Sequence, residues 1–245
     1  MNYTVIAPFY DAIMSHVGYM DWVNLIDSVT KRFSRNRSTS IFEIGAGTGV
    51  LGRYLTERGY PYIGSDLSFC MALQAKTRKM DLFCADARRL PLKSRFDLII
   101  FLYDGINYLQ SINEYRKLFV SVASFLPPGG LFLFDITTTA NSCRYFFDYS
   151  EYQEYDGVSV FRHSYYQSRK SLQINDFTLF FPLKANETLY ERKTERHIQR
   201  LFKPEQIKSA VPDRLFHCLG IWDDYSMHDY DDDSERVHFL LQRKT

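Results

Sequence analysis

Residues 41–50 read Ile-Phe-Glu-Ile-Gly-Ala-Gly-Thr-Gly-Val, a short apolar run joined directly to glycines at Gly45, Gly47 and Gly49. The apolar run predicts a buried strand, and the glycines predict a tight turn at its end. Glycine is needed where the backbone takes a positive φ or where a ligand approaches the main chain closely. The next segment can begin a helix whose free N–H groups face that ligand. The stretch therefore predicts a nucleotide-sized binding site at the end of a strand.

The spacing of the glycines distinguishes between two nucleotide cofactors. The NAD and FAD fingerprint G-x-G-x-x-G/A needs a small residue at position 50, where Val50 stands. The pattern Glu43-x-Gly45-x-Gly47-x-Gly49 instead resembles motif I of the class I S-adenosylmethionine (SAM) dependent methyltransferases. In that family this loop wraps the methionyl and ribose part of SAM, and the resemblance implies that Ala46 is among its cofactor contacts. SAM as methyl donor implies S-adenosylhomocysteine (SAH) as product. A glycine turn without a ligand is the alternative reading.

The next two predicted strands each end in an acidic residue. Residues 60–65 end at Asp66, which is placed to accept hydrogen bonds from both ribose hydroxyls, as in the Rossmann fold. Leu67, next to it, is included among the predicted cofactor contacts. Residues 81–85 end at Asp86, and the resemblance places the pair Asp86-Ala87 at the adenine amino edge. A solvated turn aspartate is the alternative reading of Asp86.

The fourth and fifth predicted strands complete an α/β pattern. A nearly continuous apolar run over 95–102 predicts a parallel strand covered on both faces. Residues 103–108 then resemble the family's motif IV region, where the reacting methyl group is presented, so Leu102 and Tyr103 are predicted cofactor contacts. An amphipathic helix and a Pro-Pro-Gly-Gly turn precede a fifth strand over 131–136. This alternation predicts a Rossmann-like, doubly wound, mostly parallel seven-stranded sheet with helices on both faces.

An N-terminal helical cap precedes this core. Apolar residues at helical spacing up to Phe33 predict a cap over 1–35, which resembles the tyrosine-rich cap that closes over SAM in many small-molecule methyltransferases. We expect Tyr10 and Tyr19 at the cofactor, and simple packing of these aromatics on the core is the alternative. Residues 1–139 and 201–245 then form the SAM-binding core, in which 215–222 and 237–242 are the closing hairpin of the sheet.

Residues 140–200 break the alternation of helix and strand. They are rich in Tyr and Phe, with turn signals at Asp156-Gly157, at 168–170 and at Lys184-Ala185-Asn186. The spacing of these turns predicts four short strands in a small antiparallel insertion. Some sugar-amine and other small-molecule methyltransferases of the family carry such an insertion, and here it would overhang the strand ends as a substrate cover. The alternative is that the aromatics form only the sheet's own core.

The amino-acid composition limits the kinds of binding partner that we expect for this protein. The 245 residues carry a formal net charge of +1, which disfavours nucleic acid without excluding it and gives no attraction to an anionic membrane. The four cysteines lie far apart without a C-x-x-C pair, so we expect neither a disulfide framework nor a metal site. No signal peptide or membrane-spanning run is evident, and we expect a cytoplasmic protein. The sequence does not decide whether the protein is a monomer or a homodimer.

The predicted chemistry follows from the sulfonium methyl group, which is already activated. A base is needed only for a protonated nucleophile, and the candidates are Asp104, Asp135, Tyr103, His163 and His197. The predicted function is methyl transfer to an N or O atom of a small-molecule acceptor. A tRNA or protein methyltransferase and a SAM-binding regulatory module without turnover are the alternatives. An NAD oxidoreductase ranks below them because of Val50.

Overall fold

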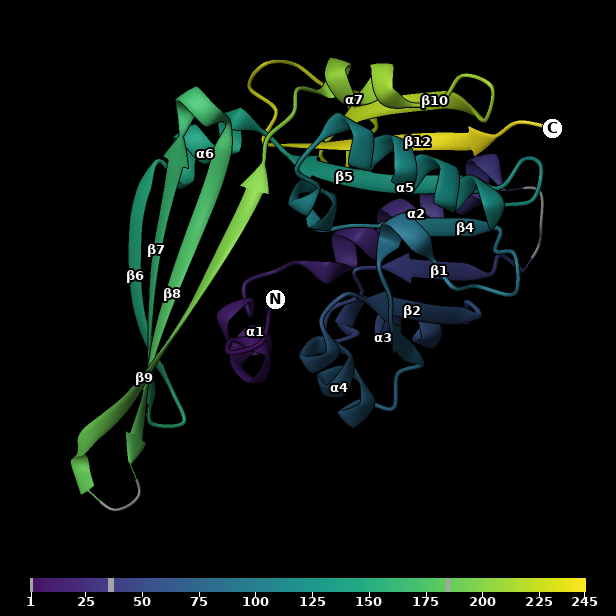
Figure 1. Ribbon diagram of the computed structural model, residues 1–245. Coiled ribbons are helices and arrows are strands. Elements are labelled where there is room, and N and C mark those ends of the chain that lie inside the picture. Colours follow the sequence, from purple (N-terminus) through teal and green to yellow (C-terminus); the bar gives the residue numbers. More distant parts are fainter. Residues whose placement is uncertain (1, 35–37, 184–185) are drawn as a thin grey trace.

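The computed structural model describes residues 2–34, 38–183 and 186–245, and its centre is an eight-stranded sheet of order β11-β10-β12-β5-β4-β1-β2-β3 (Figure 1). The parallel strands are β1 (Ile41–Ile44), β2 (Tyr62–Asp66), β3 (Leu82–Cys84), β4 (Leu98–Phe101) and β5 (Leu131–Thr137). β12 (Arg236–Arg243) lies antiparallel between β5 and β10 (Phe216–Asp223). The predicted sheet is confirmed, with one correction: the short edge strand β11 (His228–Asp229) makes eight strands rather than seven.

Helices cover both faces of this sheet, which explains why β1, β4 and β5 are buried along their whole length. α2 (Tyr19–Phe33) and α3 (Val50–Glu57) pack on the face that holds Ile41 and Ile100. α5 (Ile112–Ser124) and α7 (Pro204–Ala210) pack on the face that holds Phe42 and Ile99. α4 (Phe69–Thr77) connects β2 to β3. None of the described helices is long and apolar enough to cross a membrane.

A second, antiparallel sheet is inserted between β5 and α7. α6 (Thr139–Tyr145) leads into β6 (Asp148–Tyr155), β7 (Val158–Gln167), β8 (Leu172–Leu183) and β9 (Asn186–Arg200), which pair in that order. The turns at 156–157 and 168–170 form as predicted, whereas Lys184 and Ala185 of the third predicted turn lie outside the described residues. The strands have 8 to 15 residues and are longer than expected. In Figure 1 this sheet stands beside the carboxyl ends of the parallel strands.

The second sheet has an inner and an outer face, because successive side chains of a strand point to opposite sides. On β8 the inner residues include Asn175 and Phe177, both of which are buried. The register pairs Asn175 with His197 of β9, and Phe177 with Arg162 of β7. Residues directly opposite one another in a pair share a face. Arg162 and His197 therefore belong to the inner face.

The N-terminal segment lies between the two sheets. Its short helix α1 (Tyr10–Ile13) appears beside the second sheet in Figure 1. One apolar cluster joins Ile6 and Tyr10 of this segment to Met71 of α4 and to Phe177 and Leu179 of β8. The segment and the second sheet therefore enclose the space at the carboxyl ends of the parallel strands.

Candidate active site

A cavity of about 580 Å³, here called the outer cavity, opens at the carboxyl ends of β1, β2 and β4. In the glycine turn, Gly45, Gly47 and Gly49 have positive φ values of 67°, 57° and 78°. A Cβ atom on Gly45 would lie 2.8 Å from the ring of Phe101, so a side chain would not fit there. The predicted cofactor contacts that line the outer cavity are Tyr10, Gly45, Gly47, Asp66, Leu67, Asp86, Ala87, Leu102 and Tyr103.

Asp66 is anchored to the glycine turn. Its carboxylate accepts hydrogen bonds from the backbone N–H of Gly47 at 2.9 Å and from that of Ser68 at 2.7 Å. Burial raises the pKa of Asp66, and these two N–H groups oppose that rise. Because a carboxylate offers about four acceptor positions, Asp66 can still accept hydrogen bonds from hydroxyls in the cavity. It therefore holds the turn and also faces the predicted ribose site.

Asp86 lies at the rim of the outer cavity and is paired with Arg88. The guanidinium donates through Nε at 2.9 Å and through Nη2 at 2.6 Å. Hydrogen bonding to this side chain lowers the pKa of Asp86. Arg88 also contacts Glu114 and itself lines the cavity, although sequence reasoning did not single it out. An adenine at this rim would therefore meet an ion pair rather than a lone carboxylate.

A small recess of about 40 Å³ beside the glycine turn is lined by three further predicted contacts, Tyr19, Glu43 and Ala46. Glu43 accepts a hydrogen bond from the hydroxyl of Tyr62 at 2.5 Å, and burial raises the pKa of Glu43 to about 7. Gly49 lines neither the recess nor the outer cavity. Its positive φ at the N-terminus of α3, and the 2.9 Å from a Cβ there to Met80, make Gly49 a structural residue instead.

A second cavity of about 340 Å³, the inner cavity, lies between the central sheet, the N-terminal segment and the second sheet. Four tyrosines line both cavities and stand where the two meet: Tyr3, Tyr10, Tyr103 and Tyr108. Sequence reasoning selected Tyr10 and Tyr103 but missed the other two. The hydroxyls of Tyr3 and Tyr108 lie 2.7 Å apart, although the two residues are 105 positions apart in the chain. No local pattern in the sequence signals a contact between such distant residues.

Asp135 holds the motif IV segment in an uncommon backbone conformation. Tyr103 and Asp104 both have positive φ values, of 60° and 48°, which few non-glycine residues adopt. The fully buried Asp135 accepts hydrogen bonds from their N–H groups at 3.1 and 2.7 Å, and from Arg236 at 2.8 Å. It lines neither the outer nor the inner cavity, so Asp135 positions the segment and is not a candidate for the base.

The two other candidates of this segment, Tyr103 and Asp104, both line the inner cavity. Asp104 accepts a hydrogen bond from Arg236 at 2.9 Å and one from Gln199 at 2.5 Å. Burial raises the pKa of Asp104 while Arg236 opposes the rise. Burial raises the pKa of Tyr103 to about 12, so this side chain is a neutral phenol at neutral pH. Tyr103 is therefore not set up to accept a proton, whereas Asp104 stays a candidate whose carboxyl group is held in place by Arg236 and Gln199.

Four side chains from three segments form one hydrogen-bonded chain beside the inner cavity. The hydroxyls of Tyr3 and Tyr108 are 2.7 Å apart, and that of Tyr108 lies 2.8 Å from Nδ1 of His197. Nε2 of His197 lies 2.9 Å from the Glu195 carboxylate. Burial opposes ionisation of Glu195, but His197 and the N–H of Val5 outweigh it and lower the pKa of Glu195. An ionised Glu195 accepts from Nε2–H, which leaves Nδ1 to accept from the Tyr108 hydroxyl.

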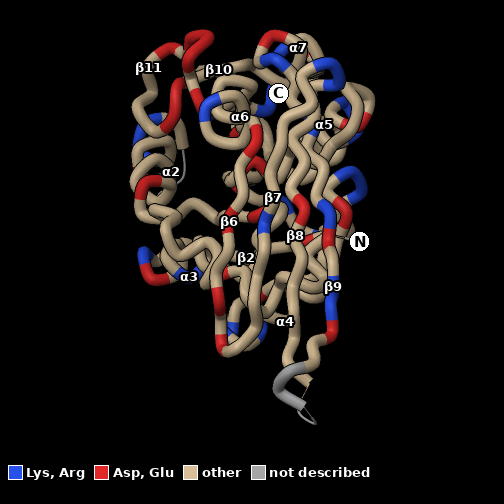
Figure 2. Tube along the Cα trace, turned by 90° about the vertical axis from the view of Figure 1, so that its left-hand side faces the viewer, with Lys and Arg blue, Asp and Glu red and all other residues tan. Residues whose placement is uncertain are grey.

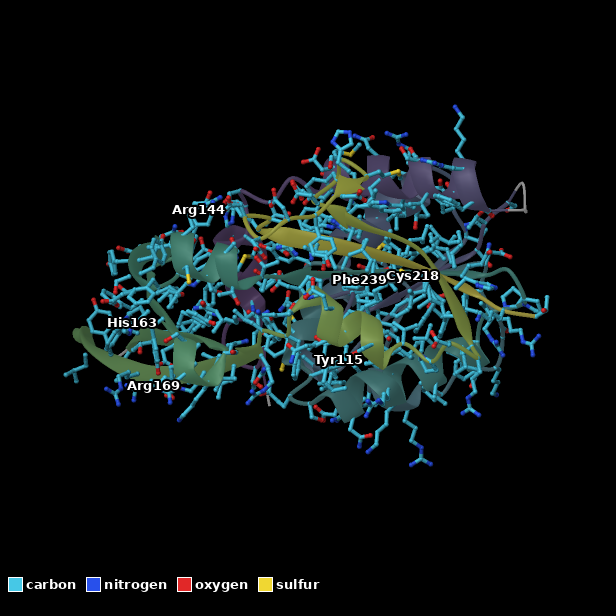
Figure 3. The ribbon with its side chains drawn as sticks, turned by 90° about the horizontal axis from the view of Figure 1, so that it is seen from above. Tyr115, Arg144, His163, Arg169, Cys218 and Phe239 are labelled. Atoms are coloured by element: carbon cyan, nitrogen blue, oxygen red, sulfur yellow. The ribbon has the colours of Figure 1, made fainter. Side chains whose placement is uncertain are left out.

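His163, the other candidate histidine, lies on the outer face of the second sheet. Its neighbour Arg162 points inward, and adjacent side chains of a strand point to opposite faces. The His163 side chain is 44% exposed and lies 2.9 Å from Asp148. Figure 3 shows it at the outer side of the second sheet, far from Phe239 of the central sheet. His163 is therefore not a candidate for the base.

The glycine turn below the outer cavity, the acid at the end of β2 and the strand order of the central sheet define the fold of a class I SAM-dependent methyltransferase. A model of the methyltransferase domain family matches residues 19–214, well over half of the chain. The protein belongs to this family. The family and the fold imply SAM as the cofactor.

Similar proteins cover nearly the whole chain. A Geobacillus sp. protein with a provisional description as a methyltransferase is 27% identical over 249 residues, which cover 99% of this chain and 100% of that protein. The structure of a SAM-dependent methyltransferase from Clostridium acetobutylicum has a TM-score of 0.81 and 24% identity, with 99% of each chain covered. The sugar N-methyltransferase KedS8 from Streptoalloteichus sp. has a TM-score of 0.77 and 19% identity, with 96% of this chain and 93% of that chain covered.

Proposed function

We propose that the protein transfers the methyl group of SAM to an N or O atom of a small-molecule acceptor bound in the inner cavity. The observation that carries this proposal is that the two cavities meet at Tyr3, Tyr10, Tyr103 and Tyr108. A donor in the outer cavity and an acceptor in the inner cavity would come together at these four rings. In this assignment Asp66 binds the ribose, and the Asp86–Arg88 pair meets the adenine.

Enclosure and charge favour a small acceptor over a macromolecule. The inner cavity is covered by the second sheet and the N-terminal segment, and about 340 Å³ is a suitable volume for a metabolite. Figure 2 shows basic and acidic positions interspersed along the described parts of β6 to β9, which gives little attraction for tRNA. A SAM-binding module without turnover needs no second cavity. The fold shared with a sugar N-methyltransferase supports an amine as one class of acceptor.

The hydrogen-bonded chain suggests how the acceptor loses its proton. SAM supplies an activated methyl group when bound, so the protein's own residues orient the acceptor, exclude water and remove a proton. Tyr108 lines the inner cavity and contacts His197, so it can pass a proton from the acceptor to Nδ1 of His197. Glu195 orients the ring and stabilises the imidazolium that results, as the acidic residue of a catalytic triad does. His197 is thus the proposed base.

Incubation of the protein with methyl-labelled SAM and separated fractions of a cell extract tests this function. The small-molecule, RNA and protein fractions are supplied one at a time, and label transfer is followed by mass spectrometry together with SAH release. We expect label in the small-molecule fraction. Label in RNA or protein instead, or SAH release no faster than in buffer with every fraction, contradicts the proposal.

A further inference from the structure

Arg162 presents a firmly held guanidinium to the inner cavity. Its Nε donates to the Ser164 hydroxyl at 2.9 Å, and its Nη2 donates to the side-chain oxygen of Asn175 at 3.0 Å. Ser164 and Asn175 are both buried and are joined by a hydrogen bond of 2.6 Å. The rings of Phe146 and Phe177 lie 5.0 and 5.7 Å from the guanidinium carbon. The side chain is thus fixed in place by polar and aromatic contacts before any ligand arrives.

Arg162 differs from Arg236 in the same cavity, whose charge is paired with two carboxylates. Arg236 donates to Asp104 at 2.9 Å and to Asp135 at 2.8 Å. Among the residues that the structure describes, no carboxylate pairs with Arg162. Glu151, its cross-strand neighbour on β6, contacts Gln153 instead.

A guanidinium has five N–H donors, and the protein contacts of Arg162 use two of them. The donors that remain available to a ligand include both N–H groups of Nη1. A carboxylate matches the planar fork of a guanidinium and forms short, charge-assisted hydrogen bonds with it. A phosphate would bring a greater charge than one arginine balances.

We propose that Arg162 binds a carboxylate of the methyl acceptor, so that the substrate is an amino or hydroxy carboxylic acid. This inference rests on the proposed function and gives the acceptor a chemical class. The nitrogen or hydroxyl that receives the methyl group would lie toward Tyr108 in the same cavity. At that side, Asp104 lines the cavity and offers a carboxyl group that can accept a hydrogen bond from an amine.

Calorimetry on the SAH-saturated protein tests the carboxylate site without knowledge of the true acceptor. Benzoate and benzamide have nearly the same shape, but only benzoate carries the charge that Arg162 would bind. We expect the wild type to bind benzoate at least about tenfold more tightly than benzamide. Arg162→Gln should abolish this preference, and Arg162→Lys should retain part of it. Arg169→Gln is the matched control, because Arg169 is exposed in the turn between β7 and β8 (Figure 3).

Two outcomes overturn the carboxylate site. One is that the wild type does not prefer benzoate to benzamide. The other is that Arg162→Gln produces the same methylated compounds from the extract at the wild-type rate. In the second case methyl transfer itself stands, so the loss of this inference is distinguishable from the loss of the proposed function. Retention of the labelled products on an anion-exchange resin, and their absence with Arg162→Gln, would support the inference.

Discussion

Nδ1 of His197 lies 2.8 Å from the hydroxyl of Tyr108, although the two residues are 89 positions apart in the chain. The contact forms because β9 of the second sheet faces the motif IV segment of the central sheet. Glu195, two residues before His197 on the same face of β9, fixes the other nitrogen of the ring. The insertion thus brings a histidine and its orienting carboxylate to the place where the two cavities meet.

Tyr108→Phe tests whether the hydroxyl of Tyr108 carries the proton. We expect kcat to fall by about a hundredfold or more, because general base catalysis contributes roughly 10²–10⁴-fold. SAM affinity measured by calorimetry should stay close to that of the wild type, since the phenyl ring still lines the outer cavity. Tyr152→Phe, at an exposed position of β6, is the control. Equal turnover by Tyr108→Phe and Tyr152→Phe would remove Tyr108 from the proton route.

Asp66→Ala should weaken SAM binding by at least about tenfold, because hydrogen bonds to a charged acceptor contribute about 1.5–3 kcal/mol each. The same change removes the acceptor of the Gly47 N–H and should lower thermal stability. Calorimetric titration with SAM and with SAH measures the first effect. Asp232→Ala, at an exposed position before β12, controls for the loss of a carboxylate. An unchanged SAM affinity in Asp66→Ala would refute the ribose assignment.

Glu43 should make stability depend on pH in a defined direction. Its pKa is about 7 in the folded protein, raised by burial from 4.5, so the folded state favours the protonated form. The contribution of this group is therefore fully present below about pH 4.5 and is lost as the pH rises toward 7. Between pH 4 and 8 the loss should be on the order of 3 kcal/mol.

Urea unfolding of the wild type and of Glu43→Gln at several pH values measures this dependence. The glutamine does not ionise, so the stability of the variant relative to the wild type should rise with pH over this interval. If the difference between the two proteins is the same at pH 4 and pH 8, the Glu43 carboxyl does not titrate as the buried site implies.

Glu195→Gln should loosen the N-terminal segment as well as reduce turnover. The Glu195 carboxylate accepts hydrogen bonds from the backbone N–H of Val5 at 2.6 Å and of Ile6 at 3.3 Å. A neutral amide accepts such bonds less strongly than a carboxylate. Hydrogen exchange at Val5 and Ile6 should therefore be faster in Glu195→Gln than in Glu191→Gln, a change at an exposed position of the same strand. Equal protection in both variants would show that Glu195 does not anchor the segment.

Much of the donor site could be predicted from the sequence because its signals are local. The turn at Gly45 and Gly47 follows from the need for positive φ next to an apolar strand, and Asp66 follows from its place at the next strand end. Gly49 belongs to the same pattern, yet its closeness to Met80 of the segment after α4 gives it a structural role. Asp135 also lies near a strand end, and only the structure reveals that its carboxylate accepts hydrogen bonds from Arg236 and from two backbone N–H groups.

The acceptor side could not be predicted in the same way, because it depends on strand register. Arg162 and His163 are adjacent, and a shift of one residue would exchange the inner one for the outer one. The aromatic residues and turns of the insertion predict strands but do not say which face of each strand meets the core. Tyr3 and Tyr108 come together only through the packing of the N-terminal segment against the motif IV segment.

A comparison of His197→Gln with His163→Gln tests whether His197 is the base. Both changes remove an imidazole from the second sheet, but only His197 contacts Tyr108 and faces the inner cavity. With an acceptor identified from the extract, we measure SAM affinity and kcat for both variants and the wild type. We expect all three to bind SAM equally, with kcat reduced by about a hundredfold or more in His197→Gln alone. Equal kcat values in the two variants would contradict the assignment of His197 as the base.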